Sequence, residues 1–421
     1  MNELTYSTYS ESPPPKHPRL LVAGALLLLM AVLLLAAISY WRGAQLPQGP
    51  NYQQDLQQLE EKHRNLTQAD PQSAFVFYQL AKHTGNFATA HDAEQALEVF
   101  AQDRELNLIR AKLLLSMHEV VRGKALLETL GDSRHDSRLQ DLQLDLYLQQ
   151  GEYQNALAML DERLAEAPQW SDIALYAHLL HKFGDSALAD QFYQAAQTRL
   201  SVKQIKDYAW LELQRGIMDL ENKQYPAARI HFSLANQIYP GHWLIEEHLA
   251  ETLALLGETA EAIKLYEGVI QKSDNPLYFY ALGSLLETTD TLRARQLKQD
   301  AETHFLQRYK HYPLAAAGHL LDVWIEQHHA HPTAENRARL LELSQANVQA
   351  RPNAEALIQR IQVLQLDQQN DAAQQLAQQL AATPWRTADV IQIAKTYGIP
   401  LAQPDVLATA PTLLQALSLR D

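Results

Sequence analysis

The chain has 421 residues, no cysteine, and 49 acidic against 35 basic residues, which gives a formal net charge of −14. The absence of cysteine excludes disulfides, thiol nucleophiles and zinc–thiolate sites. The negative charge and the lack of a basic stripe argue against a nucleic-acid partner, because neutralising phosphates requires clustered Lys and Arg. Only 15 glycines occur, and good helix formers dominate, so we expect an all-helical protein.

The N-terminal region predicts a membrane anchor. Residues 1–19 form a tail rich in Ser and Pro, without apolar periodicity, which we expect to be disordered. Residues 20–41 carry no charge and would form about 33 Å of helix, enough to cross a bilayer and longer than the core of a cleavable signal peptide. Lys16 and Arg19 precede this transmembrane helix and Arg42 alone follows it closely. This bias favours a cytoplasmic N-terminus and, in a bacterium, a periplasmic location for the rest.

The next segments predict a linker and a first group of irregular helices. Residues 42–50 contain Gly and Pro and make a short linker, and residues 51–137 are expected to be atypical helical N-terminal repeats. An apolar stripe with heptad-like spacing opens this region, at Tyr52, Leu56, Leu59, His63 and Leu66. The stripe is too short for a coiled coil, so we expect it to pack against Phe75, Phe77 and Tyr78, with dimerisation as the alternative.

From about residue 138 the chain repeats one phrase with a period near 34 residues. The clearest copy is Gly151, Tyr153, Ala156, Leu160 and Pro168. The phrase places a small residue where two helices cross and an aromatic or Leu one turn later. The small residues are Ala156, Ala189, Ala228, Ala262 and Ala301, and the aromatic residues are Tyr193, Phe232, Tyr266 and Phe305. A fixed period of this length predicts a stack of helical hairpins.

This phrase resembles that of the tetratricopeptide repeat family, whose unit is a pair of antiparallel helices closed by a proline. The resemblance is clear over residues 138–313 and degenerate over 314–385, with capping helices expected over 386–421. It implies a right-handed superhelical solenoid behind the single transmembrane helix, in a membrane-anchored bacterial member of the family. The first helix of each hairpin would line a concave groove.

The resemblance also indicates candidate binding residues, because ligands of such proteins lie along the inner face made by the first helices. The matching positions here are Asp141, Asp145, Ala174, His178, His181, Leu213, Ile217, Leu220, Glu247, Glu251, Tyr280 and Ser284. They lack the Lys, Arg and Asn with which some members of the family clamp a terminal carboxylate. We therefore expect an extended or helical segment with some basic character, the alternative being that the acidic side chains are merely solvated.

No catalytic or metal-binding motif stands out in the sequence. A Gly-rich phosphate loop and a nucleophile elbow are both absent. The histidines of residues 328–331 fall in a predicted loop, where neighbouring side chains point apart, and His248 lies off the helical face shared by His242 and Glu246. We therefore expect no metal, no cofactor and no enzymatic activity.

These features predict a single-pass membrane-anchored scaffold or adaptor that mediates protein–protein interactions in assembly of an envelope complex. The resemblance suggests secretion, a pilus, polysaccharide export or cytochrome maturation. The expected partners are proteins or peptides of a membrane-associated complex at the bacterial inner membrane, and the repeat domain is expected in the periplasm. One alternative is a periplasmic chaperone-like factor that binds client peptides near a translocon. An alternative of another class is an enzyme with an unrecognised site in residues 51–131 or 386–421, although no nucleophile is grouped with a base there.

Overall fold

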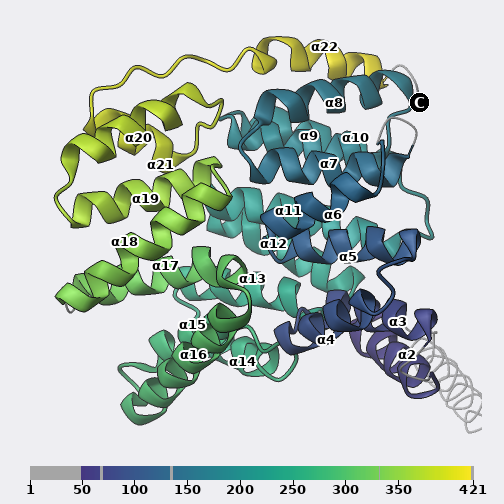
Figure 1. The fold of residues 1–421 in the computed structure, drawn as a ribbon, viewed down its shortest axis with the longest axis horizontal. Helices are drawn as coiled ribbons and strands as arrows, with labels where there is room; N and C mark the ends of the chain where they lie inside the picture. Colours follow the sequence, from purple (N-terminus) through teal and green to yellow (C-terminus); the bar gives the residue numbers. More distant parts are fainter. Residues whose placement is uncertain (1–48, 67–69, 133–135, 331, 419–421) are drawn as a thin grey trace, which may run out of the picture. The chain divides into compact units, whose positions relative to one another are not determined.

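The computed structural model describes residues 49–66, 70–132, 136–330 and 332–418, and within these ranges every regular element is a helix (Figure 1). This confirms the all-α expectation. The predicted tail at residues 1–19 and the predicted transmembrane helix at 20–41 lie outside the described residues. Among the helices that are described, none is both long and apolar enough to cross a membrane.

Most of the helices pair into hairpins that follow one another in chain order. The pairs are α3 (Pro71–Thr84) with α4 (Phe87–Glu98), α5 (Arg104–Ser116) with α6 (Val120–Thr129), α7 (Ser137–Gln149) with α8 (Tyr153–Glu166), α9 (Trp170–Lys182) with α10 (Ser186–Thr198), α11 (Ile205–Glu221) with α12 (Tyr225–Ile238), α13 (Trp243–Leu255) with α14 (Thr259–Val269), α15 (Pro276–Leu286) with α16 (Thr291–His311), α17 (Pro313–Ala330) with α18 (Ala334–Ala350), and α19 (Ala354–Leu366) with α20 (Asn370–Ala382). Helix α2 (Tyr52–Arg64) precedes the hairpins, and α21 (Ala388–Thr396) and α22 (Val406–Ser418) follow them.

Asp residues at equal intervals start the first helices of the early hairpins. Asp70, Asp103 and Asp136 follow one another at the length of one repeat, and each side chain accepts a backbone N–H from the helix that it precedes. Such N-caps satisfy amide groups that have no partner inside the helix. The hairpin period therefore begins at α3, before the clear copies of the sequence phrase.

The small and aromatic residues of the phrase lie between the helices of each hairpin. The five alanines at the helix crossings are fully buried, and the aromatic residues one turn later are nearly so. Gly216 shows how close the approach is, since a Cβ at that position would lie 2.5 Å from a ring carbon of Phe232. Each hairpin is thus held by close packing that a larger residue would disrupt.

The turns inside most of the described hairpins contain one residue with a left-handed backbone. Gly85, His118, Gly151 and Gly184 occupy this position in four successive hairpins, evenly spaced along the chain, with φ between 60° and 99°. Lys223, Gly257 and Gln368 occupy it in later hairpins. Glycine adopts this conformation without steric penalty, which explains the small residue that opens the sequence phrase.

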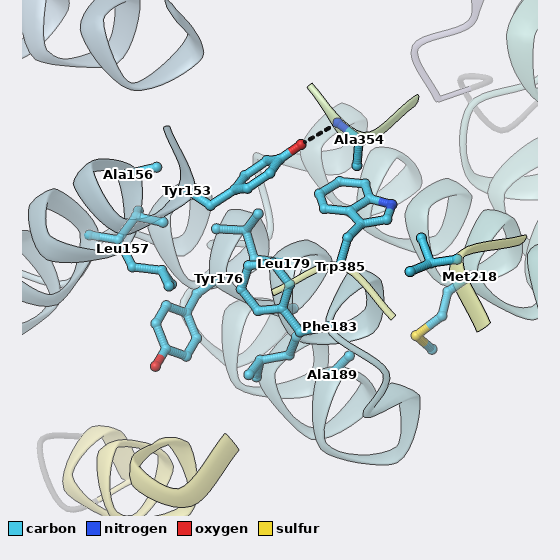
Figure 2. Packing of buried hydrophobic residues seen from close by; sticks show 14 of the residues in the cluster. Tyr153, Ala156, Leu157, Tyr176, Leu179, Phe183, Ala189, Met218, Ala354 and Trp385 are labelled. Carbon is cyan, nitrogen blue, oxygen red and sulfur yellow. Dashed lines mark hydrogen bonds between the residues drawn. The ribbon is translucent and has the colours of Figure 1, made fainter. Parts of the chain in front are cut away.

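The second half of the chain lies alongside the first, because hairpin turns of the first half contact loops of the second. The Trp243 indole donates a hydrogen bond to the carbonyl oxygen of His83, and the Ala354 amide donates to the Tyr153 hydroxyl (Figure 2). The Arg386 amide donates to the Lys182 carbonyl oxygen. We call this set of contacts the turn–loop seam. It joins residues that are roughly 160 to 220 positions apart, about five to seven hairpin repeats.

The seam also contains a buried charge network around Glu94, which is 4% exposed. Its carboxylate accepts hydrogen bonds from Arg110 and Arg122, and from the Tyr312 hydroxyl at 3.0 Å. Because a buried carboxylate is stable only when it is paired, Glu94 depends on Tyr312 and the two arginines.

Candidate protein-binding site

The twelve residues that the sequence indicates lie on the first helices of five consecutive hairpins. Asp141 and Asp145 are on α7, and Ala174, His178 and His181 are on α9. The remaining residues are Leu213, Ile217 and Leu220 on α11, Glu247 and Glu251 on α13, and Tyr280 and Ser284 on α15.

Their exposure divides these residues into three groups. Ala174, His181 and Leu213 are buried, so they offer a ligand little or no surface in this conformation. Asp141 and Ser284 are exposed, and the others are half-buried. Burial lowers the pKa of His178 to about 4, assisted by the charge of Lys182, so this histidine is neutral at pH 7.

Most of the charged members already have partners within the fold. Asp141 accepts a hydrogen bond from Arg163 at 2.7 Å, and Asp145 accepts one from Gln149 at 2.9 Å. His181 Nε2 lies 2.9 Å from a carboxylate oxygen of Glu221. Of these two aspartates, Asp141 therefore has a cationic partner, whereas the hydrogen-bond partner of Asp145 is a neutral amide.

Glu247 and Glu251 flank His248 on α13. His248 Nδ1 lies 3.3 Å from Glu247 Oε2 and 3.6 Å from Glu251 Oε2, and its ring stacks on Phe232. Burial raises the pKa of Glu247 to about 7. The sequence brings His248 together with His242 and Glu246 instead, but in the structure Glu246 pairs with Lys272. In the described residues this is the one group whose ligand atoms could meet at a metal ion, and its imidazole already lies within ion-pair distance of both carboxylates.

A cavity of about 720 Å³ lies where α2 and α3 meet α11 and α13. We call it the Trp–Lys cavity after the residues that set its chemistry. The rings of Trp170 and Trp210 meet edge to face at 5.9 Å, and Trp210 is 41% exposed. The basic residues of its lining are Lys62, Lys82 and Lys206. A large aromatic surface beside several cations suits the recognition of another chain.

One wall of the cavity is internally balanced. The Lys206 ammonium lies 2.6 Å from Asp55 Oδ2, and the Tyr239 hydroxyl donates to the same oxygen. Despite burial, these hydrogen bonds hold the pKa of Asp55 below its ordinary value. Burial lowers the pKa of His242 to about 4, so its ring adds no charge at neutral pH.

The rest of the lining carries a net positive charge. Lys62 and Lys82 form no ion pair with any described residue. The remaining carboxylate of the lining, Asp207, attracts Lys82 and offsets part of this charge. The cavity therefore combines an aromatic surface with ammonium groups that outnumber the carboxylates beside them.

The cavity extends the inner face that the sequence indicates toward the N-terminus. Gln79, which lines the cavity, occupies the position on α3 that Asp145 and His178 occupy on α7 and α9. The three residues are separated along the chain by whole multiples of the repeat length. Of the residues indicated by the sequence, only Leu213 lines it. The other lining residues could not be identified from the sequence, because α2 and α3 contact α11 and α13 only through the turn–loop seam. The pairing of Trp170 with Trp210 carries no local sequence signal.

Hairpins in series, with the alanines of the phrase at their crossings, define this chain as an all-α helical-repeat protein of tetratricopeptide-like construction. No family model matches the chain, and no curated protein does. Among solved structures it is similar to yeast Tom70, at 12% identity over 91% of this chain and 94% of that chain, with a TM-score of 0.36.

Two further solved structures show a similar degree of likeness. The APC/C hetero-tetramer Cut9–Hcn1 matches at 14% identity over 77% of this chain and 76% of that chain, with a TM-score of 0.35. Human IFIT1 with PPP-AAAA matches at 14% identity over 78% and 85%, with a TM-score of 0.39. At such identities and scores these matches assign neither a family nor a partner.

Proposed function

We propose that this chain is a single-pass membrane-anchored adaptor whose helical array holds a segment of a partner protein. The Trp–Lys cavity carries the proposal, because it offers an exposed aromatic surface and two lysines that form no ion pair with a described residue. Such a surface binds other chains through apolar contact and charge complementarity. The adaptor would act without catalysing a reaction, in assembly of an envelope complex such as one for secretion, a pilus, polysaccharide export or cytochrome maturation.

The uncharged stretch at residues 20–41 supports the membrane anchor. The basic residues before that stretch support a cytoplasmic N-terminus, with the array on the periplasmic side of a bacterial inner membrane. A reporter that is active only in the periplasm, fused after Asp421, tests this orientation. Activity of a cytoplasmic reporter at the same place would reverse it.

Site-specific photo-crosslinking tests the adaptor function in native membranes. A photoreactive amino acid replaces Trp210 in one variant of the full chain and Val202 in another. Val202 is 93% exposed and does not line the cavity, which makes it the matched control. We expect a single, reproducible protein adduct from position 210 and none from position 202.

Other adduct patterns have distinct meanings. A chain that purifies as a clean monomer, with no adduct at position 210, would refute the adaptor function. A ladder of many weak adducts would refute a dedicated adaptor and favour a chaperone-like factor.

A further inference from the structure

A second hollow adjoins the Trp–Lys cavity through a shared residue. This hollow has a volume of about 330 Å³ and lies among α3, α5 and the start of α4. Lys82 lines both the hollow and the cavity. The two spaces therefore present one surface, from the Trp170–Trp210 pair past Lys82 to Lys112.

The second hollow contains cations and no carboxylate among the residues that line it. Its charged residues are Lys82, Lys112 and Arg308. Arg308 is balanced by Asp274 at 2.8 Å, whereas Lys82 and Lys112 form no ion pair with a described residue. Burial lowers the pKa of Lys82, and repulsion from Lys112 adds to the effect. This basic surface lies in a chain whose formal net charge is −14.

We propose that the two hollows together take an extended acidic segment of the partner protein. An aromatic or aliphatic side chain of that segment packs against Trp170 and Trp210, and its Asp or Glu side chains meet Lys62, Lys82 and Lys112. Alternate side chains of an extended segment point in opposite directions, so one face can supply the carboxylates. This inference rests on the proposed adaptor function, and it replaces the partly basic segment expected from the sequence with an acidic one, because cations outnumber carboxylates in the two hollows.

The charges around the lysines favour a peptide over a nucleic acid. Asp207 lies in the cavity, and Asp145 stands on α7 one repeat beyond Lys112. A nucleic acid would bring a continuous row of phosphates against these carboxylates as well as the lysines. An acidic peptide segment can instead place its carboxylates beside the lysines and uncharged side chains beside the aspartates.

Binding of a simple acidic peptide tests the inference. The probe is a fluorescein-labelled peptide of roughly ten alternating Glu and Tyr residues, which reaches about 33 Å when extended, with an amidated C-terminus so that only side-chain carboxylates are presented. The full-length chain is held in detergent micelles, and binding is followed by fluorescence anisotropy. A Lys–Tyr peptide and an oligothymidylate of equal length serve as comparison probes. We expect the Glu–Tyr peptide to bind most tightly, with an affinity that falls as salt rises.

Charge-reversal variants locate the binding site. Lys82→Glu with Lys112→Glu should weaken binding of the Glu–Tyr peptide by about tenfold or more. Lys264→Glu with Lys395→Glu makes the same change in net charge at two exposed positions outside both hollows, and should leave the affinity within about twofold. Trp210→Ala should also weaken binding, and far-ultraviolet circular dichroism checks that each variant is folded.

Several outcomes would overturn the inference. Equal weakening by both charge-reversal pairs would mean that the peptide responds to overall charge alone. Tighter binding of the oligothymidylate or the Lys–Tyr peptide would reject an acidic segment. If the crosslink at position 210 forms but the Glu–Tyr peptide does not bind, the inference fails while the adaptor function stands. If no crosslink forms, the adaptor function fails whatever the peptide does.

Discussion

Asp274 caps a helix that begins far before it in the chain, at Phe87. The N-cap residue of α4, Asn86, makes no side-chain capping bond of its own. Instead the Asp274 carboxylate accepts the amides of Phe87 and Ala88, at 3.0 and 3.4 Å. In return the Asn86 side chain accepts the amide of Asp274. The start of α4 is therefore tied to the loop between α14 and α15.

We expect Asp274→Ala to lower the free energy of unfolding by about 2–4 kcal/mol, because it removes the cap, the negative charge at a helix N-terminus and the counter-charge of Arg308. Asp274→Asn keeps an oxygen acceptor and should lose less. Urea denaturation measures both variants, and amide hydrogen exchange should accelerate at Phe87 and Ala88 in the alanine variant. Unchanged exchange at these two amides would contradict a capping role.

At the scale of the hairpin, one glycine serves both the turn and the seam. Gly151 has a φ of 72°, and a Cβ there would lie 2.6 Å from the carbonyl oxygen of Pro352. Gly257 occupies the same position of a later hairpin with a φ of 83°, and a Cβ there would meet nothing within 4 Å. The two glycines therefore differ only in what faces them.

This difference predicts unequal effects of the same substitution. Gly257→Ala should lower the free energy of unfolding by about 1–2 kcal/mol through the left-handed backbone alone. Gly151→Ala should lower it by about 1–3 kcal/mol more, because the new methyl group collides with the second half of the chain. Thermal or urea denaturation of both variants measures the difference. Equal losses would show that the Gly151–Pro352 approach has no energetic weight.

The hairpins were largely predictable from sequence, since their small and aromatic residues recur at fixed offsets. The early repeats were harder to recognise because His118 fills the left-handed turn position where Gly85 and Gly151 stand. The loop predicted around His328 and His329 was wrong. His328 and His329 belong to the last turn of α17 and not to a loop, because no residue before Ala330 ends that helix. His331 lies outside the described residues.

The candidate site was less predictable, because it depends on contacts across the seam. Lys82 and Trp210 come from different repeats, and no periodic rule relates them. The sequence places charged side chains on a helix face, but it does not show which of them are neutralised. Arg163 forms an ion pair with Asp141, whereas Lys112 forms none with a described residue.

At the scale of the whole array, buried histidines make stability depend on pH. Burial is the main cause that lowers the pKa values of His118, His178 and His242 to about 4, from an ordinary value near 6.5. Because the fold favours their neutral form, the stability that they contribute is present above pH 6.5 and is lost as pH falls toward 4. Glu247 acts in the opposite sense, since its raised pKa adds stability below pH 4.5 that is lost as pH rises through 7.

We expect the three histidines to outweigh Glu247, so the melting temperature should fall as pH is lowered from 6.5 to 4. His178→Gln removes one titrating group, while Lys182, His181 and Glu221 around it remain, and it should flatten this decline. Differential scanning calorimetry across the pH range measures both. A melting temperature that rises on acidification would show that Glu247 dominates.

The turn–loop seam also has a consequence for the time course of folding. Its contacts join residues roughly 160 to 220 positions apart, so the first half leaves the ribosome long before its counterpart exists. At typical synthesis rates the wait is roughly 10 to 40 seconds. During that interval Glu94 lacks Tyr312, and the amino end of α4 lacks Asp274. The nascent first half therefore displays unsatisfied surfaces that a chaperone can bind, and the last contacts to form are those of highest contact order.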